Sequence, residues 1–514
     1  MSVPILIRSR SGVKRDGTQF EGDNYIDALW CRFQRGLPRK IGGYRAVTST
    51  LPERVYGMHV YSQNSVQYAH VGGATTLEQI TMDVFGNFSG QNARIPGGFL
   101  NSVNNVWQFD LLPDDTGGTP PRLIAHAGQN LGAIDSTIET PIYYGDVTAG
   151  GALVASALDD ESGGVVVLFP YLLAFGNQGK IESSDANDPT VSLGFANITG
   201  TKLVRGLPLR GSGQGPSGLF WSLDSLVRAT FNPTIAASGV GVPFSFDTIS
   251  SQQSLLSSRS IIEYDGVFYW WAVDRPMLFN GVVQTLPNSQ NVNWLLDNIN
   301  MQQRQKMYSF KVPRFGEIWW CFPFGNATEC THAVIYNVNE KTWYDTALPV
   351  QNQAGLGRTA GYFAQVYSKP FMCDQYLTTT PGYTLWQHET GTDSINGSNI
   401  QPVRSYFKTA EISMLTQEQA KDKALRVGSV EPDFVQAGDL ILTVEGRQNA
   451  RAADVSSAQF TITPSASTPQ EQTIPLKEVR RLMSFKIESN VAGGDYQMGD
   501  TLAFVQEDEG RTRS

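Results

Sequence analysis

Five carboxylates of the sequence could do acid–base chemistry if the fold brought two of them together: Asp185, Asp188, Asp274, Glu317 and Glu389. Hydrolysis of a glycosidic bond needs carboxyl groups about 5–5.5 Å apart for retention of configuration and about 6.5–9.5 Å apart for inversion. Nothing in the spacing pairs these residues, and the S-x-D-x-G-x-x-W motif of sialidase propellers is absent. We therefore predict no catalytic residue and no enzyme activity, with a propeller-type hydrolase as an alternative.

Cysteine and histidine could supply a metal site through Cys321, Cys330, His332 and Cys373. Their spacing lacks the paired Cys-x-x-Cys or His-x-x-x-His units of zinc sites. With Cys31 they make four cysteines in 514 residues, too few for a disulfide framework, so we expect synthesis in a reducing cytoplasm. We predict buried thiols and no metal site.

A glycine-rich stretch at 211–218, GSGQGPSG, is the nearest approach to a phosphate-binding loop. Such a loop must lead into a helix whose N-terminus faces the anion. This stretch contains Pro216 and leads into the strand-like Leu219-Phe220-Trp221. We therefore predict no bound cofactor.

Tryptophans offer a different kind of site, because an exposed indole can stack on a sugar ring. Trp271, Trp320 and Trp386 could do so in a receptor-binding or glycan-binding protein. Packing between strands is the commoner use of such residues in a β-rich chain. The glycan-binding function therefore stands as an alternative.

The composition indicates a protein of short strands and tight turns. The chain has 50 glycines, 26 phenylalanines, 19 tyrosines and 10 tryptophans, and 17% of its residues are charged. Long helices would raise the charged fraction. The net charge of −9 argues against a dedicated duplex-binding protein, since these usually carry a basic face. No stretch approaches the 18 apolar residues of a membrane span.

Three regions follow from the pattern. Residues 1–50 hold nine Lys or Arg and four acids, which predicts a basic N-terminal arm that docks on an acidic partner or DNA, or is simply solvated. Within it, 25–33 could form a short helix or a buried strand. Residues 51–400 predict a β-propeller-like domain, and residues 401–514, with alternating apolar and polar positions, predict an antiparallel β-sandwich.

Repeats support the propeller. Residues 260–281 and 315–344 each carry a turn, two adjacent tryptophans and a further strand–turn–strand. A period near 40–50 residues with about four strands is typical of a propeller blade, and we expect about five to seven blades. A β-sandwich or a β-helix remains the alternative. The segment 292–307 lacks Gly and Pro and predicts a short helix between two blades.

Several segments between 260 and 510, and one near the N-terminus, together carry a likeness to a known family. Four of them are Arg35–Arg45 (RGLPRKIGGYR), Phe315–Pro323 (FGEIWWCFP), Leu385–Gly391 (LWQHETG) and Glu478–Lys486 (EVRRLMSFK). In order and style they resemble the tail nozzle and packaged-DNA stabilisation proteins of short-tailed bacteriophages. The likeness covers over half of the chain, and residues 50–250 match only as generic blades.

The resemblance implies a virion structural protein rather than an enzyme. It implies a propeller subunit assembled with itself as a ring, usually a homohexamer, at the distal end of the tail tube. Its partners would be the tail adaptor and portal-proximal proteins, a tail fibre or needle, and double-stranded DNA passing through without sequence-specific binding. The ring would retain the packaged genome and form its exit channel, in a virion whose proteins are made in the host cytoplasm.

Overall fold

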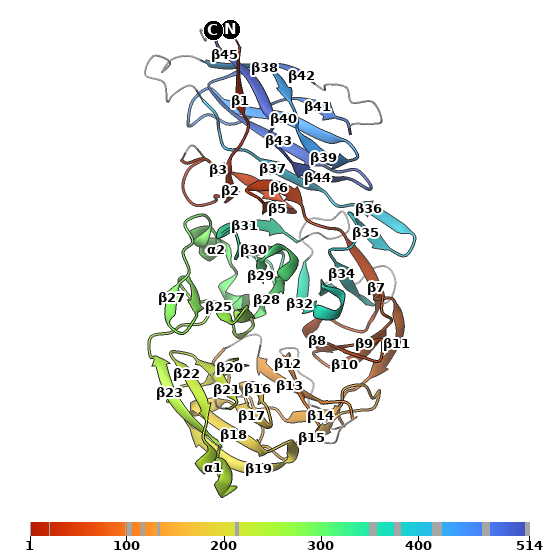
Figure 1. Ribbon diagram of the computed structural model, residues 1–514, viewed down its shortest axis with the longest axis vertical. Helices are drawn as coiled ribbons and strands as arrows, with labels where there is room; N and C mark the ends of the chain where they lie inside the picture. Colours follow the sequence, from red (N-terminus) through yellow and green to blue (C-terminus); the bar gives the residue numbers. More distant parts are fainter. Residues whose placement is uncertain are drawn as a thin grey trace.

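The structure is a computed structural model of the 514-residue chain. It describes all residues except 1, 20, 98, 100–104, 115–118, 131–133, 211–214, 349–356, 375–381, 414–423, 465–472 and 509–514. The protein is mainly β, built from many four-stranded antiparallel sheets that lie around a common centre, with further sheets at one end (Figure 1).

Six four-stranded sheets follow one another along the chain, each a meander in which neighbours in sequence pair. The first three contain β8 (Val55–Gln63), β9 (Val66–Gly73), β10 (Leu77–Met82) and β11 (Phe88–Ala93); β12 (Asn105–Leu112), β13 (Arg122–Asn130), β14 (Ile142–Asp146) and β15 (Val154–Ala155); and β16 (Gly164–Leu168), β17 (Tyr171–Phe175), β18 (Lys180–Asp185) and β19 (Asp188–Asn197). The next three contain β20 (Leu203–Pro208), β21 (Ser217–Ser222), β22 (Leu226–Phe231) and β23 (Phe244–Ser250); β24 (Ile262–Tyr264), β25 (Val267–Trp271), β26 (Pro276–Phe279) and β27 (Val283–Thr285); and β28 (Tyr308–Val312), β29 (Glu317–Phe322), β30 (His332–Asn337) and β31 (Thr342–Ala347).

The seventh sheet is completed by a strand from the beginning of the chain. Its order is β32 (Arg358–Ala364), β33 (Lys369–Asp374), β34 (Tyr383–His388) and then β7 (Tyr44–Leu51), extended by β35 (Asp393–Asn396) and β36 (Asn399–Pro402). β32 contacts β8, so the last sheet meets the first and the ring closes. In the described part of the chain this gives seven propeller-like sheets, within the predicted range.

Short connections explain why these sequences form hairpins. Asp265 and Gly266 both have positive φ, 50° and 80°, and join β24 to β25 with Tyr264 opposite Val267. Asp-Gly suits a two-residue turn whose twist matches that of the strands. The short helical segments are α1 (Pro233–Ser238), α2 (Val292–Asn298), η1 (Asn177–Gly179), η2 (Ser258–Ser260), η3 (Met301–Lys306), η4 (Pro313–Phe315) and η5 (Gln365–Tyr367). The helix predicted over 292–307 is therefore present as α2 followed by η3.

Aromatic side chains fill the space between neighbouring sheets. Trp221 of the fourth sheet and Trp270 of the fifth have ring centroids 5.8 Å apart. Trp271 of the fifth sheet lies 6.3 Å from Trp320 of the sixth, in an edge-to-face arrangement. Edge-to-face pairs of buried rings are each worth about 0.5–1.5 kcal/mol beyond their area. Many aromatic residues of the sequence therefore serve to pack neighbouring sheets against each other.

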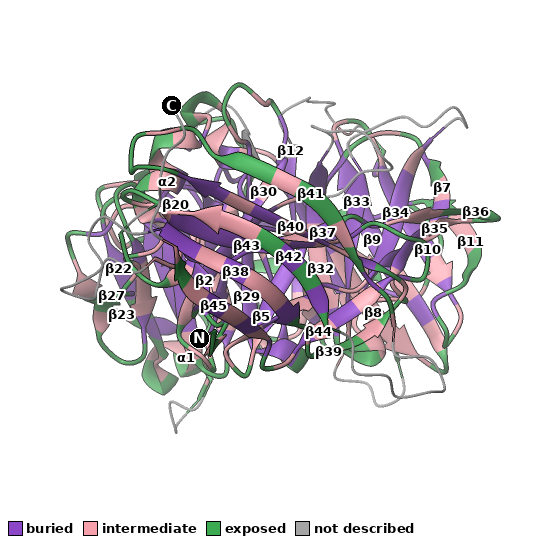
Figure 2. Cartoon of the chain, turned by 90° about the horizontal axis from the view of Figure 1, so that it is seen from above, coloured by how far each residue is buried: buried purple, intermediate pink, exposed green. Residues whose placement is uncertain are grey.

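The remaining sheets combine both ends of the chain. Their orders are β1 (Val3–Leu6), β45 (Leu502–Asp508), β38 (Ala424–Glu431), β42 (Ile474–Arg480); β4 (Asp27–Leu29), β37 (Ser405–Lys408), β43 (Leu482–Ser489), β40 (Leu440–Arg447), β41 (Val455–Ile462); β39 (Phe434–Ala437), β44 (Asp495–Met498), β6 (Leu37–Lys40), β5 (Cys31–Gln34); and the parallel pair β2 (Arg10–Val13), β3 (Asn24–Tyr25). We call these the terminal sheets. In them β1 lies beside β45 (Figure 1). Burial is deepest in inner strands such as β40 and β43, while β41 is exposed (Figure 2).

The first 50 residues are thus strands of two sheet systems. β1, β4 and β6 pair with C-terminal strands, whereas β7 belongs to the seventh sheet. Residues 25–33, left open between helix and strand, form strands. A sandwich made of residues 401–514 stays a prediction; in the structure these residues share their sheets with the N-terminus.

Candidate functional site: the junction around Arg32

One buried arginine joins three parts of the chain that are far apart in sequence. Arg32 is on β5, Glu317 begins β29, and Glu389 follows β34. Arg32 Nε lies 2.8 Å from Glu317 Oε1, and its Nη1 donates to Glu389 Oε2 at 3.1 Å. The Arg32 and Glu317 side chains are 1% and 0% exposed. This cluster therefore ties the terminal sheets to the sixth and seventh sheets of the ring.

Further hydrogen bonds occupy both oxygens of Glu317. Tyr344 donates its hydroxyl to Oε1 at 2.6 Å, and Trp319 donates Nε1–H to Oε2 at 2.9 Å. The guanidinium of Arg32 lies 3.6 Å from the centre of the Phe315 ring. A buried charge is tolerated only when it is paired and hydrogen-bonded in this way.

The pKa values of the cluster reflect burial and pairing together. Burial raises the pKa of Glu317, and the attraction of Arg32 only partly opposes that rise. Burial by itself would lower the pKa of Arg32, but the carboxylates of Glu317 and Glu389 raise it above its ordinary value. A general acid must reach a substrate, whereas Glu317 is fully enclosed. The arrangement is suited to holding elements together.

An aromatic layer lies beside the ion cluster. Tyr44 meets Trp386 edge-to-face at 5.1 Å and stacks on His388 at 5.0 Å, while Trp30 meets Trp319 at 5.8 Å. Gly43 is required here, because a Cβ at this position would lie 2.3 Å from the carbonyl oxygen of Asp393. Gly42 and Gly43, directly before β7, therefore bring the chain close to the segment between β34 and β35.

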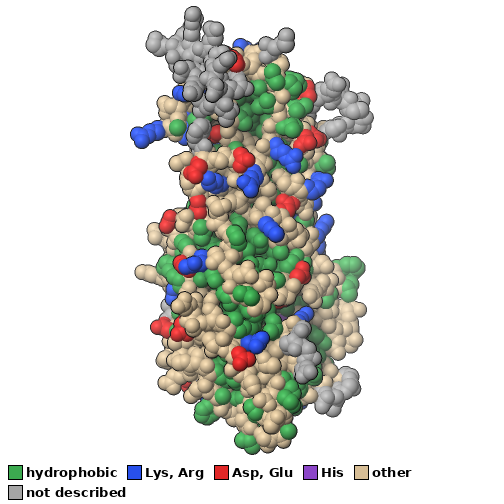
Figure 3. Space-filling model, turned by 60° about the vertical axis from the view of Figure 1, so that its left-hand side comes forward, with side chains coloured by type: hydrophobic (Ala, Val, Ile, Leu, Met, Phe, Trp, Pro, Cys, Tyr) green, Lys and Arg blue, Asp and Glu red, His purple; other side chains and the backbone are tan. Residues whose placement is uncertain are grey.

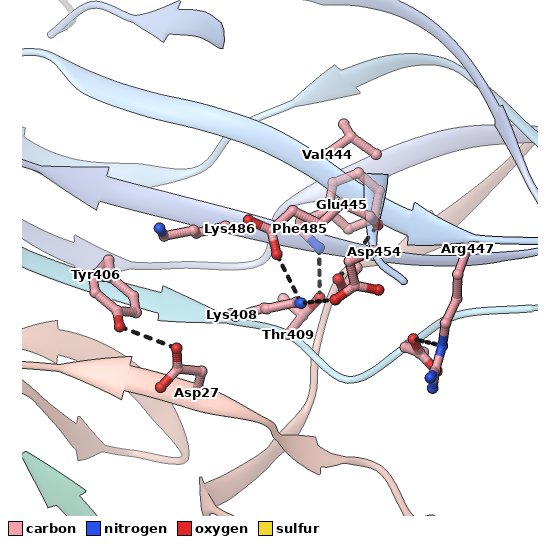
Figure 4. Close-up of polar contacts among 12 residues, drawn as sticks. Asp27, Tyr406, Lys408, Thr409, Val444, Glu445, Arg447, Asp454, Phe485 and Lys486 are labelled. Carbon is pink, nitrogen blue, oxygen red and sulfur yellow. Dashed lines mark hydrogen bonds and ion pairs between the residues drawn. The ribbon is translucent and has the colours of Figure 1, made fainter. Parts of the chain in front are cut away.

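A second ionic cluster fastens the N-terminal strands within the terminal sheets (Figure 4). Lys408 of β37 contacts Glu445 at 2.7 Å and Asp454 at 2.8 Å, and Tyr406 donates its hydroxyl to Asp27 at 3.0 Å. Burial lowers the pKa of Lys408, but the hydrogen bonds to the two carboxylates outweigh it and leave the pKa raised. These contacts hold β4, β37 and β40 in register.

Several cations of residues 1–50 are paired within the protein. Arg15 contacts Asp27 at 2.7 Å and Asp345 of β31 at 2.9 Å. Lys40 donates to the Gly494 carbonyl at 2.6 Å. These cations make contacts within the protein, whereas the charge excess of residues 1–50 predicts that the segment docks on a partner. That docking function stays a prediction for the exposed cations.

The other carboxylates considered for acid–base chemistry lie apart from the junction. Asp185 and Asp188 face each other across the β18–β19 hairpin, and their carboxylates accept hydrogen bonds from Ala186 and Thr190. Asp274 pairs with its exposed neighbour Arg275. The structure thus brings together Asp185 with Asp188, and Glu317 with Glu389 through Arg32. Arg32 itself was missed, because the charge excess around it gave no sign of its distant partners.

The cysteines and His332 are packed among apolar side chains. All four thiols are free and buried, and the His332 ring stacks on Phe324 at 4.2 Å. Within the described residues no three His, Cys, Asp or Glu side chains gather as metal ligands would. The Gly-rich stretch at 211–218 falls partly outside the described residues. Trp271, Trp320 and Trp386 are 0–1% exposed, so none of them offers a face to a sugar.

Buried thiols give a direct test of the packing. Burial raises the pKa of Cys31 and Cys321 to about 12, so few thiolates form at pH 8. We expect a thiol-specific disulfide reagent at pH 8 to modify none of the four cysteines of the native chain within minutes. In denaturant all four should react. Fast modification of one native thiol would show that its surroundings open to solvent.

Comparison with known proteins identifies no family. No protein-family profile and no curated protein matches the chain. Among solved structures, that of BBS1N in complex with ARL6DN has 8% identity and a TM-score of 0.40, over 69% of this chain and 99% of that one. Raptor from Chaetomium thermophilum has 9% identity and a TM-score of 0.39, over 68% of this chain and 29% of that one. Among the described helices none is long and apolar enough to span a membrane.

Proposed function

We propose that the protein is a structural subunit of the tail nozzle of a short-tailed bacteriophage. In this proposal the seven sheets form a β-propeller, and the C-terminal strands form a sandwich that contacts neighbouring subunits. About six copies surround an axial channel. The assembly retains packaged DNA and lets it leave, in contact with the adaptor and with a fibre or needle.

One observation carries the proposal. A single hydrophobic core cluster contains residues from four of the segments in which the sequence resembles nozzle proteins: Ile41 and Tyr44, Phe315 and Trp319, Trp386, and Met483 and Phe485. The same cluster includes strands of the ring and of the terminal sheets. The residues that resemble nozzle proteins therefore lie where the ring is joined to the terminal sheets. A structural subunit needs such a rigid connection.

The layout also suits a subunit that bears load. The terminal sheets contain N-terminal and C-terminal strands, and they are joined to the ring by the buried pair Arg32–Glu317 and by the partly buried pair Arg15–Asp345. Buried ion pairs with good hydrogen bonding define one relative position of the elements that they join. A channel-forming ring needs such rigidity, because its opening is set by how the subunits are held.

Electron microscopy of the purified chain and of virions tests the proposal. We expect rings of about six copies with an axial opening, and antibody labelling at the tip of the tail. A chain that stays monomeric at high concentration and is absent from purified virions would refute it. A glycan array and polysaccharide hydrolysis assays, run in parallel, should be blank; activity there would favour the receptor-binding or hydrolase alternatives.

A further inference from the structure

A basic cavity lies on the outer side of the Arg32 junction. Its volume is about 330 Å³, and its walls come from the β5–β6 turn, from η4 and the β30–β31 turn of the sixth sheet, and from β44. The residues that matter for its chemistry are Arg35, Arg39, Arg314, Phe315, Glu340 and Gln497. The cavity therefore spans the boundary between the ring and the terminal sheets.

The backbone fixes where the arginines stand. Arg35 and Gly36 have φ of 54° and 76° and form the two-residue turn between β5 and β6, with Gln34 opposite Leu37. Arg314 lies in the single turn η4, which Gly316 ends in the left-handed conformation. Both side chains extend from tight turns, whose backbones have little freedom. The cavity is thus lined by guanidinium groups from anchored positions.

Phe315 organises two of the three guanidinium groups. Its buried ring lies 5.1 Å from the Arg314 guanidinium and 5.6 Å from that of Arg39. Arg32 contacts the same ring at 3.6 Å and is neutralised by its own two carboxylates. Cation–π contacts of this kind hold a guanidinium in place without neutralising its charge. Arg39 and Arg314 therefore remain charged toward the cavity.

The positive charge in the cavity exceeds the negative charge. Its one lining carboxylate, Glu340, uses Oε2 to accept hydrogen bonds from Ser11 and from the amide of Gly36. Arg39 donates to the neutral Gln34 at 2.8 Å. In the part of the chain that the structure describes, no ion pair joins Arg35, Arg39 or Arg314 to a carboxylate. Three cations and one anion leave an excess of two positive charges.

We propose that this cavity is a binding site for a phosphate-type oxyanion. Guanidinium groups bind phosphate through paired N–H donors, and several can share one tetrahedral group. A single carboxylate has one charge and two oxygens, so it would leave most of these donors unused. The bound group is either inorganic phosphate or one phosphodiester of a nucleic acid. This inference does not depend on the proposed nozzle function.

A neighbouring cavity limits how a longer ligand could lie. It has a volume of about 390 Å³, shares Arg35 and Gln497 with the basic cavity, and is also lined by Arg8, Asp433 and Asp500. Its two arginines and two aspartates cancel, and Asp500 lies 3.9 Å from Arg8, so this side has no excess positive charge to attract a polyanion. A nucleic acid strand would therefore enter from the side of Arg314.

The test uses the full chain with Arg35 and Arg314 both changed to Gln. Both residues are exposed, so the double variant should fold as the original does. The matched control is Arg228→Gln, which removes an exposed arginine of the fourth sheet. Calorimetric titration with inorganic phosphate, and fluorescence anisotropy with labelled single-stranded and duplex DNA, are run at constant ionic strength.

We expect the original chain to bind phosphate, and R35Q/R314Q to lose about ten-fold or more in affinity, since each charge-assisted hydrogen bond is worth a sizeable fraction of the binding free energy. R228Q should bind as the original does. Phosphate binding without DNA binding identifies the free ion as ligand; DNA binding that weakens in the same variant identifies the phosphodiester. Absence of both phosphate and DNA binding, or equal binding by the double variant, would overturn the proposal.

Discussion

Replacing Arg32 by Met is expected to lower the free energy of unfolding by about 3–5 kcal/mol, because breaking a buried ion pair leaves an uncompensated charge. Glu317 would keep its hydrogen bonds from Tyr344 and Trp319 but lose its cation. Chemical denaturation monitored by tryptophan fluorescence measures the loss. Arg404→Gln is the control, since Arg404 is 49% exposed and its pair with Glu488 should contribute at most about 1 kcal/mol.

The loss in the Arg32→Met variant should depend on pH in a defined direction. Burial raises the pKa of Glu317 above its ordinary value of 4.5, and without Arg32 the opposing attraction is gone. A carboxyl whose folded pKa is raised adds stability below its unfolded pKa, and this stability is lost as pH rises through the folded pKa. The difference in free energy of unfolding between the original chain and Arg32→Met should therefore be smaller at pH 5 than at pH 7. R32M/E317Q should recover part of it at pH 7, and a single variant as stable as the original would contradict the role of the pair.

A chain cut by a protease at a site inserted after Pro52 is expected to stay together as one particle. β7 pairs with β34 from Tyr44 opposite His388 to Leu51 opposite Tyr383, and further N-terminal strands pair with β45, β37 and β44. Size-exclusion chromatography of the cut chain should show one peak that contains both fragments. A chain that lacks residues 1–51 should be insoluble, because the edge of β34 and the partners of Trp30 would be exposed.

Mixing the two fragments after separation in denaturant provides the matching control. We expect the folded particle to return only when both fragments are present, because each fragment supplies one strand of every strand pair that joins them. Fragments that elute separately under native conditions, or a soluble and folded piece beginning after residue 52, would show that the N-terminal strands are not part of the cooperative unit.

Much of the ring could be predicted from the sequence, because six of its seven sheets are local meanders. Turns such as Asp265–Gly266 and repeated pairs of tryptophans mark hairpins within short stretches of chain. Such signals are read from neighbouring residues alone. The prediction of propeller-like sheets between residues 51 and 400 rests on them, and the structure shows sheets of this kind there.

The junction could not be predicted in the same way. Arg32 is separated from Glu317 by 285 positions and from Glu389 by 357. Neither the charge excess of residues 1–50 nor the scattered carboxylates indicate which will meet. The pairing partner of a strand such as β1 is equally hard to predict, because this edge strand is mostly exposed and its apolar and polar residues form only a weak pattern. Non-local pairing leaves no mark in one sequence.

The pairing of Val3 with Val505 has a consequence for how the protein is made. At about 5–20 residues per second, a ribosome takes tens of seconds to reach the partner of the first strand. β1 waits for β45, and β7 waits for β34, while the six intervening meanders can already form as they emerge. The nascent chain therefore spends most of its synthesis as an open ring with its leading segment unpaired. Chaperone binding during translation should accordingly concentrate on residues 1–51, and the ring should close through β7 and β34 before β45 has emerged to pair with β1.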